Sequence, residues 1–564
     1  MPLLCLTVVA AGAVKAPLTH ETMWLMKRVS GPVPSPDGKW VVLSLAEPAY
    51  DGKEQVSDLW LAAADGSAAP RRITFSKAAE GAPAWCPDSR RLAFTAKREG
   101  DDVAQVYLLD LAGGGEAVRV TSLSTGASAP KWSPDGRLLL FTSLVFRGAA
   151  GDEANRKIAA ERKARKYHAR VYEGFPIRYW DRWLDDRQAH LFVQAAEAGA
   201  KARDLLAGSK LVSSPGFAGT ETPSGQELAA AWAPDGRSVV FAAAVNHNEA
   251  AFAAVKTHLF QAPVEGGEPR PLTGGEGSYS RPEFRPDGRA LAALYRREGG
   301  KLYSLSRIAL FAWPAAGAPV IATGEFDRSV DSFAFTADSR TIWLLAEEAG
   351  HGKLFSLPAG GGQVRPAFEV KLGGYSGLAV PRKAQGIFAT FDSAVNPAEV
   401  VRIDPDAKSH RLLTSFNAAQ AEAVDWQPLR HFWFTSRRGK RIHNMLVLPA
   451  GFDQQKKYPL VALIHGGPHS MWRDQFFLRW NYHLIAGSKY VLLLTGYTGS
   501  TGYGEEFAQQ IQGDPLRGPG EEINEAVDEA VKRFAFVDGS RLAAGGASYG
   551  GHLANWLQAT TTRY

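Results

Sequence analysis

A serine close to the end of the sequence stands in the setting that a nucleophilic serine requires. The run GASYG (546–550) follows an apolar stretch that predicts a strand, and it precedes a stretch with helical spacing. Small residues around the serine allow a strained strand-to-helix turn that exposes the hydroxyl group. Amides at the start of the following helix would stabilise negative charge on a substrate oxygen. We therefore interpret Ser548 as a candidate nucleophile.

A second glycine-rich element lies upstream of this serine. The sequence YPLVALIHGGPH (458–469) predicts a buried strand that runs into the loop His465-Gly466-Gly467-Pro468. In α/β-hydrolases, the loop at this place in the chain order contributes a backbone N–H to the oxyanion hole. Apolar strands alternate with helical segments from residue 426 to 564. We therefore expect an α/β-hydrolase domain here, with a doubly wound, mainly parallel sheet.

The chain before residue 426 repeats a short phrase. An apolar or aromatic residue is followed by Pro-Asp-Gly or a close variant, a basic residue and an apolar run, which predicts a tight turn and a strand. The copies are PSPDGKWVVLS (34–44), WCPDSRRLAFTA (85–96), WSPDGRLLLFTS (132–143), WAPDGRSVVFAA (232–243), FRPDGRALAALY (284–295), FTADSRTIWLLA (335–346) and a degenerate VPRKAQGIFATF (380–391).

A second phrase follows each copy, with an apolar strand, a small or Gly-rich turn and another short strand, as in QVYLLDLAGGGEAVRVT (105–121). Two hairpins per unit make a four-stranded blade, and seven units predict a seven-bladed β-propeller over residues 17–425. The alternative, an arbitrary all-β sandwich, does not account for the paired phrases.

An insertion of about 147–189 interrupts the third unit. It contains the aromatic residues Tyr172, Phe175, Tyr179, Trp180 and Trp183. These rings either anchor the insertion to the propeller or line a substrate cavity. Its basic run, which includes Arg156, Lys157 and Arg162, is interpreted as a solvated helix face, because acidic residues are interspersed.

Composition narrows the classes of function. The 564 residues carry a net charge of +6 without a clustered basic surface, so we expect no nucleic-acid partner. The 2 cysteines form no metal-ligand spacing, and we expect neither a metal nor another cofactor. The apolar run at 3–14 is too short to span a membrane. Residues 1–16 are a possible signal peptide, so we expect a periplasmic or secreted protein, and otherwise a cytoplasmic one.

The combination of a propeller, HGGP and the run GGASYGG (545–551) resembles the prolyl oligopeptidase family, in its acylaminoacyl-peptidase and dipeptidyl-peptidase branch. The resemblance covers nearly the whole chain. It implies a serine peptidase that acts on short peptides through an acyl-enzyme on Ser548. It also implies that the amides of Gly467 and Tyr549 form the oxyanion hole, and that the propeller restricts access to the serine.

The sequence departs from the family pattern at two places. The family often has Asn-x-Arg-Gly-Ser after the fourth strand of the hydrolase domain, where this chain has Gly-Tyr-Thr-Gly-Ser (496–500). The expected order is Ser, then Asp or Glu, then His, yet only residues 560–564 follow the helix after Ser548. We therefore expect the hydrolase domain to be incomplete at the C-terminus and the chain as given to be inactive.

Other functions stay open at this point. A carboxylesterase on the same fold is one alternative, and a catalytically inert propeller that binds other proteins is another. The sequence shows no clear acidic pair or arginine for a substrate N-terminus, so dipeptidyl, acylaminoacyl and endo-acting cleavage all remain possible.

Overall fold

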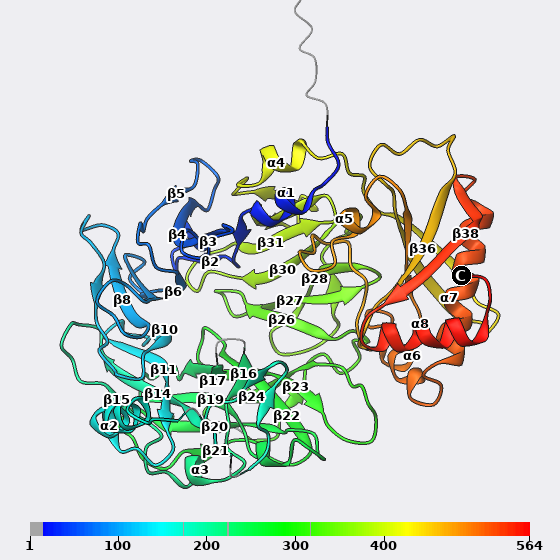
Figure 1. Ribbon diagram of the computed structural model, residues 1–564. Coiled ribbons are helices and arrows are strands. Elements are labelled where there is room, and N and C mark those ends of the chain that lie inside the picture. Colours follow the sequence, from blue (N-terminus) through cyan, green and yellow to red (C-terminus); the bar gives the residue numbers. More distant parts are fainter. Residues whose placement is uncertain (1–14, 168, 173, 223–224, 316) are drawn as a thin grey trace, which may run out of the picture.

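The computed structural model describes residues 15–167, 169–172, 174–222, 225–315 and 317–564 (Figure 1). Seven sheets form a ring, and a mixed sheet with helices follows them along the chain. The prediction of a seven-bladed propeller and an α/β-hydrolase domain is confirmed. The possible signal peptide lies outside the described residues except for Lys15 and Ala16, and Ala16 forms a parallel bridge with Val424.

Each of the first three blades is one stretch of chain. The first has β1 (Arg28–Val29), β2 (Val33–Pro34), β3 (Trp40–Glu47), β4 (Val56–Ala63) and β5 (Arg71–Arg72). The second has β6 (Glu80–Trp85), β7 (Arg91–Ala96), β8 (Gln105–Asp110) and β9 (Val118–Arg119). The third has β10 (Ser128–Trp132), β11 (Leu138–Phe146), β14 (Arg187–Ala195) and β15 (Arg203–Asp204). Its insertion holds α2 (Gly151–Lys163), β12 (Arg178–Tyr179) and β13 (Arg182–Trp183).

The remaining blades follow the same order. The fourth has β18 (Ala230–Trp232), β19 (Ser238–Ala244), β20 (Thr257–Pro263) and β21 (Arg270–Pro271), preceded by the hairpin β16 (Thr220–Thr222) and β17 (Gly225–Glu227). The fifth has β22 (Gly277–Phe284), β23 (Ala290–Arg297), β24 (Arg307–Ala312) and β25 (Val320–Ile321). The sixth has β26 (Val330–Phe335), β27 (Thr341–Glu348), β28 (His351–Pro358) and β29 (Arg365–Pro366). The seventh has β30 (Gly374–Ala379), β31 (Ile387–Ser393), β32 (Asn396–Asp404) and β33 (Ser409–Leu412).

The repeated phrase forms the turn between the first two strands of a blade. In the third blade, Asp135 accepts hydrogen bonds from the Ser133 hydroxyl at 2.6 Å and the Arg137 amide at 3.1 Å. Gly136 in the same turn has a φ of 70°, where a residue with a side chain would be strained. The turn is therefore specified by its own residues, as the sequence indicates.

The aromatic residue of the phrase joins successive blades. The Trp132 indole N–H donates to the Ala84 carbonyl of the second blade at 3.0 Å. The Trp232 indole repeats this contact with the Lys131 carbonyl of the third blade at 3.1 Å. Apolar side chains of neighbouring blades complete the packing, so each blade buries a face against the next.

The second domain is built on a five-stranded sheet with the order β34-β35-β37-β36-β38. Its strands are β34 (Arg430–Thr435), β35 (Arg441–Val447), β36 (Tyr458–Ile464), β37 (Val491–Gly496) and β38 (Val537–Gly546). Pairing is antiparallel from β34 to β37 and parallel around β36. Alternate residues of β36 and β37 enter separate hydrophobic clusters, which shows that both faces of the sheet are covered.

Helices of the second domain cover these faces. They are α5 (Tyr482–Ala486), α6 (Glu505–Gln509), α7 (Arg517–Arg533) and α8 (Tyr549–Thr560). The short helices α1 (His20–Leu25), α3 (Lys210–Ser213) and α4 (Ala418–Glu422) belong to the propeller and its connections. In the described ranges, no helix combines the length and the apolar character needed to cross a bilayer.

The two domains are joined by polar contacts, of which those of Asp474 are buried. The Asp474 carboxylate accepts from the backbone amides of Gly373 at 2.7 Å and Ala394 at 2.8 Å, which lie in loops of the sixth and seventh blades. The Glu505 amide donates to Asp327 at 2.8 Å, and the Glu505 carboxylate accepts from the Leu305 amide at 3.0 Å. These loops lie at the end of the blades opposite the repeated turns, so this end of the propeller faces the hydrolase domain.

Candidate active site

Ser548 lies at the sharp turn between β38 and α8. Its backbone has a φ of 56° and a ψ of −127°, a conformation that residues other than glycine rarely adopt. Such strain persists where the surrounding structure enforces it, and it is common at catalytic residues. The Ser548 side chain is exposed. The geometry is therefore that of a serine presented to solvent by a strained turn.

Two glycines of the GASYG run hold this turn against the neighbouring strand. A Cβ atom on Gly546 would lie 2.4 Å from the Ile464 carbonyl oxygen, and one on Gly550 would lie 2.2 Å from it. Both distances are far below van der Waals contact, so the packing of the turn on β36 requires glycine at both positions. The spacing that identified the serine in the sequence thus has a steric cause.

The HGGP loop passes beside the serine. A Cβ atom on Gly466 would lie 3.2 Å from the Ser548 Cβ and 3.7 Å from the Ser548 Oγ. Within the described ranges, the backbone amides of Gly467 and Tyr549 donate to no turn, loop, cap or side-chain acceptor. Tyr549 is the first residue of α8, where amides lack a partner inside the helix. Both predicted oxyanion-hole amides are therefore available close to the serine.

The side chain of Tyr549 is fixed rather than free. Its hydroxyl donates to the Pro515 carbonyl, and its ring centroid lies 6.0 Å from that of Tyr497. Burial raises the pKa of Tyr549 above its ordinary value. Tyr549 therefore stays protonated, and its side chain is held against Pro515 and Tyr497.

The loop that departs from the family pattern is anchored inside the domain. Thr498 donates to the Glu522 carboxylate through both its amide and its hydroxyl, each at 2.7 Å. The Ser500 hydroxyl donates to His465 Nε2 at 2.9 Å, and His465 Nδ1 donates to the Gly466 carbonyl at 2.8 Å. Burial lowers the pKa of His465 to about 4. His465 therefore stays neutral and supports the HGGP loop, and neither ring nitrogen is free to take a proton from Ser548.

The other histidines near the domain core are also engaged elsewhere. His469 Nε2 contacts the Ala508 carbonyl at 3.2 Å, and His483 Nε2 contacts the Gln427 carbonyl at 2.9 Å. His552 lies on α8 with an exposed side chain. In the part of the chain that the structure describes, no histidine, aspartate or glutamate side chain forms a hydrogen bond with the Ser548 hydroxyl.

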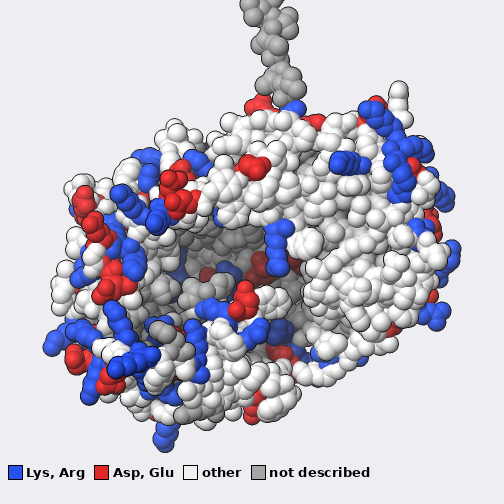
Figure 2. All heavy atoms as spheres, in the orientation of Figure 1, with Lys and Arg blue, Asp and Glu red and all other residues white. Residues whose placement is uncertain are grey.

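The junction of β38 and α8 faces the propeller side of the molecule (Figure 1). Figure 2 shows a deep hollow between the blades and the hydrolase domain, with basic and acidic side chains on its walls.

Four aromatic rings of the insertion are exposed: Trp180 is 80% exposed, Trp183 50%, Phe175 49% and Tyr179 40%, which speaks against the interpretation that they anchor the insertion. The Tyr172 hydroxyl donates to the Leu184 carbonyl at 3.0 Å, a contact within the insertion itself. The basic residues Arg156 and Lys157 are exposed on α2, and Arg156 pairs with Asp152 at 2.8 Å, which fits a solvated helix face.

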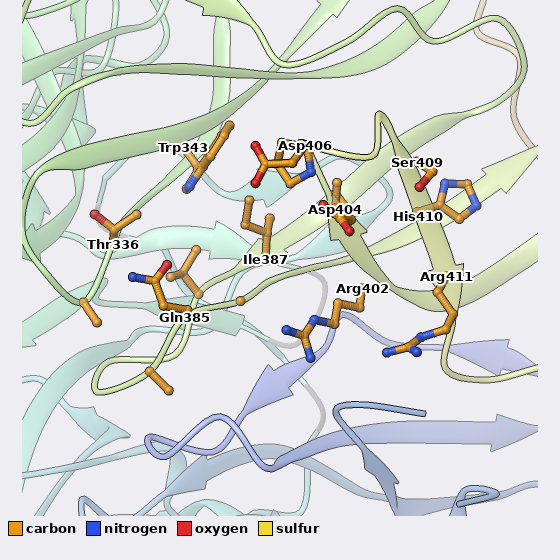
Figure 3. Close-up of a pocket in the computed structure, with 16 residues that line it drawn as sticks. Thr336, Trp343, Gln385, Ile387, Arg402, Asp404, Asp406, Ser409, His410 and Arg411 are labelled. Atoms are coloured by element: carbon orange, nitrogen blue, oxygen red, sulfur yellow. The ribbon is translucent and has the colours of Figure 1, made fainter. Parts of the chain in front are cut away.

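A cavity of about 620 Å³ lies between the sixth and seventh blades, away from this site. Trp343, Gln385, Arg402 and Asp406 are among the residues that line it (Figure 3). It opens beside the turns after β26 and β30, at the end of the propeller opposite the loops that bind the hydrolase domain. This cavity therefore takes no part in the site around Ser548.

Comparisons with known proteins agree with this architecture. Residues 22–159 match the model of the TolB beta propeller domain, and residues 475–564 match the model of the prolyl oligopeptidase family. A propeller joined to a sheet with a serine at a strand-to-helix turn defines the class of propeller-bearing α/β-hydrolases. In residues 475–564 the chain is similar to the prolyl oligopeptidase family.

Among its relatives is dipeptidyl-peptidase 5 of Schizosaccharomyces pombe, 26% identical over 393 residues, which span 69% of this chain and 56% of that protein. Probable dipeptidyl-peptidase 5 of Emericella nidulans is 28% identical over 408 residues, with 69% and 56% covered. The chain thus spans little more than half the length of these relatives.

Solved structures share the fold at lower identity. An acylaminoacyl peptidase in complex with Z-Gly-Gly-Phe-chloromethyl ketone has a TM-score of 0.73 at 19% identity, with 97% of this chain and 77% of that chain covered. A puromycin hydrolase has a TM-score of 0.61 at 18% identity, with 99% and 80% covered. Proteins with different named activities therefore share this arrangement of domains.

Proposed function

We propose that this chain carries the nucleophile of a serine peptidase that hydrolyses short peptides through an acyl-enzyme on Ser548. The observation that carries the proposal is the exposed Ser548 in its strained turn beside Gly466, with two unused backbone amides nearby. The names of the relatives, dipeptidyl-peptidase and acylaminoacyl peptidase, support peptide bonds as the target.

The roles follow from the geometry. The Ser548 hydroxyl attacks the substrate carbonyl carbon, and the Gly467 and Tyr549 amides donate to the oxygen as it gains negative charge. Attack requires a base that accepts the hydroxyl proton, and His465 does not fit this role because both its nitrogens are bonded. We therefore propose that the base and its acidic partner come from residues other than those described around the serine.

The test is turnover of short peptides by the natural protein, compared with its Ser548→Ala variant. We expect the loss of kcat/KM to be at least roughly 10³-fold, because only binding and the oxyanion donors would remain. Ser540→Ala, an exposed serine on the same strand, is the matched control and should keep full activity. Turnover of simple esters alongside peptide amides separates the peptidase from a carboxylesterase. Retained peptide hydrolysis in Ser548→Ala would rule out the proposed nucleophile.

A further inference from the structure

One position of the propeller repeat faces the centre of the ring. The first strands of neighbouring blades contact each other, as β6 does with β10, β18 with β22 and β26 with β30. These strands therefore surround the central channel. In five blades, the residue just before the aromatic residue of the repeated phrase lies at the same position of the first strand. It pairs there with a residue of the second strand. These five residues are Ala84, Lys131, Ala231, Glu283 and Ala334.

The charged members of this set break the pattern of small residues. Lys131 and Glu283 stand where the three other blades have alanine. Arg281 is a second exception, because it occupies the left-handed bulge position of its strand with a φ of 51°, where the second and third blades have Ala82 and Ala129 at 49° and 52°. An arginine in this strained position is not explained by packing, since its side chain is exposed.

These side chains form one electrostatic cluster. Arg382, from the turn between β30 and β31, and Arg281 both act on Lys131, as do the carboxylates of Glu283 and Glu227. Burial, followed by the charge of Arg382, lowers the pKa of Lys131. Burial raises the pKa of Glu283 against the pull of Arg382 and Arg281. Charges from the third, fifth and seventh blades and from β17 therefore meet inside the ring.

The cations of this cluster lack close partners. Within the described ranges, Lys131, Arg281 and Arg382 form no ion pair with a carboxylate at 4.0 Å or less. The Lys131 ammonium donates to the Ala230 carbonyl at 2.5 Å, and the Arg281 guanidinium lies 6.0 Å from the centroid of the Phe333 ring. All three side chains are exposed to solvent. Lys131 is also surrounded by many protein atoms, because it lies inside the ring of blades. Cations in a solvent-filled channel with protein walls concentrate anions there.

We propose that Lys131, Arg281 and Arg382 bind the carboxylate of a peptide inside the propeller channel. Arginine suits this ligand because its planar guanidinium matches a carboxylate with two parallel hydrogen bonds. The cations of the cluster exceed its carboxylates by one, so a single carboxylate neutralises it. The identity of the ligand as a peptide rests on the proposed function. The carboxylate belongs either to the peptide C-terminus or to an acidic side chain.

The test measures binding without cleavage, in the Ser548→Ala protein. Three fluorescent peptides share one neutral sequence: one has a free C-terminus, one has a C-terminal amide, and one has the amide with an internal Glu. We expect one or both peptides that carry the carboxylate to bind about tenfold more tightly than the neutral amide, the fold-change for one charge-assisted hydrogen bond. The difference should shrink as salt is added. Which of the two peptides gains affinity identifies the source of the carboxylate.

The variants Lys131→Met, Arg281→Met and Arg382→Met should each reduce this preference, and the double variant Lys131→Met/Arg281→Met should remove it. Arg289→Met, at an exposed arginine on a turn of the same blade as Arg281, is the matched control and should keep it. Because Arg382 lies on an exposed turn, its variant tests the cluster even if Lys131→Met fails to fold.

Equal affinity for all three peptides, no measurable binding of any, or a preference that survives the double variant would overturn the proposal. If the natural protein showed no Ser548-dependent hydrolysis of peptides but the carboxylate preference remained, the proposed function would be wrong and the binding site would still hold.

Discussion

The propeller and the hydrolase domain are held together in different ways. A blade is specified within its own fifty or so residues, by a turn such as that at Asp135 and by a tryptophan that bonds the preceding blade. The hydrolase turn at Ser548 depends on atoms far away in the sequence, because its glycines pack on the Ile464 carbonyl. We therefore expect a substitution in a propeller turn to destabilise only its own blade, whereas a substitution at the serine turn should destabilise the whole sheet of the hydrolase domain.

The largest effect is expected from Gly550→Ala. The added Cβ would lie 2.2 Å from the Ile464 carbonyl oxygen and 2.8 Å from that of His465, and both are backbone atoms that cannot move alone. We expect the free energy of unfolding of the hydrolase domain to fall by about 3 kcal/mol or more, as for severe overpacking. Thermal unfolding followed by calorimetry should show this loss in one transition, with the propeller transition unchanged.

The matched control is Gly52→Ala, because a Cβ atom on Gly52 would contact nothing within 4 Å. If Gly550→Ala unfolded at the wild-type temperature, the steric account of the serine turn would be wrong.

The next effect concerns the contact between the two regions. Asp474→Ala removes the acceptor of the Gly373 and Ala394 amides and leaves both amides buried without a partner. We expect a loss of about 3 kcal/mol, from two charge-assisted hydrogen bonds in a buried setting. Limited proteolysis should then cut between the domains faster than in the wild type. Asp453→Ala, at a half-exposed aspartate that bonds only nearby residues, should leave the cutting rate unchanged.

Acid should weaken the same boundary. His431 from β34 contacts His443 from β35 at 3.1 Å, and its ring stacks on that of His351 from the sixth blade. Burial first, and then neighbouring histidines, lowers the pKa of His431 to about 4 and that of His443 to about 3. The groups that face these rings are the Tyr503 hydroxyl, the Asp474 carboxylate and the Lys353 ammonium.

The sign follows from these values. The folded pKa lies below the ordinary value of 6.5, so the unfolded protein binds more protons as pH falls. The contribution to stability is therefore fully present above pH 6.5 and is lost as pH falls toward 4. Each pH unit in this window costs up to about 1.4 kcal/mol per histidine. Urea unfolding at a series of pH values should show the decline, and His431→Gln should make it shallower. His20→Gln, at an exposed histidine, should not change the slope.

The smallest effect is expected from a turn of the propeller. Asp135→Ala removes the acceptor for the Ser133 hydroxyl and the Arg137 amide in an exposed turn. We expect a loss of about 1 kcal/mol, because water replaces these partners and the rest of the blade is unaffected. A loss as large as that of Gly550→Ala, measured by the same calorimetry, would contradict the distinction between the two regions.

The sequence predicts much of this fold because its signals are local. The seven turns, the serine run and the HGGP loop each lie within a few residues, and the structure has all of them. The helix α7 shows where local patterns fail. It begins at Arg517 and includes Gly518, Pro519 and Gly520, although residues of these types in sequence favour a loop. Tertiary contacts hold them in the helix instead, including that of Gly520 with Trp556.

The contacts between distant segments were not predictable. Nothing near Asp474 indicates that its carboxylate bonds amides at residues 373 and 394, about a hundred positions earlier. The channel cluster was missed for the same reason, since Lys131, Arg281 and Arg382 come from different blades. One signal was present in the sequence: the residue before the phrase aromatic is alanine in three copies and charged in two.

The central claim is that Ser548 is the residue that becomes acylated, and its most direct test is covalent labelling of the natural protein. A fluorophosphonate probe should attach to one residue, and peptide mass spectrometry should locate it at Ser548. The Ser548→Ala variant should take up no label, while Ser540→Ala should be labelled as the wild type is. Label on another residue, or label that persists in Ser548→Ala, would contradict the account.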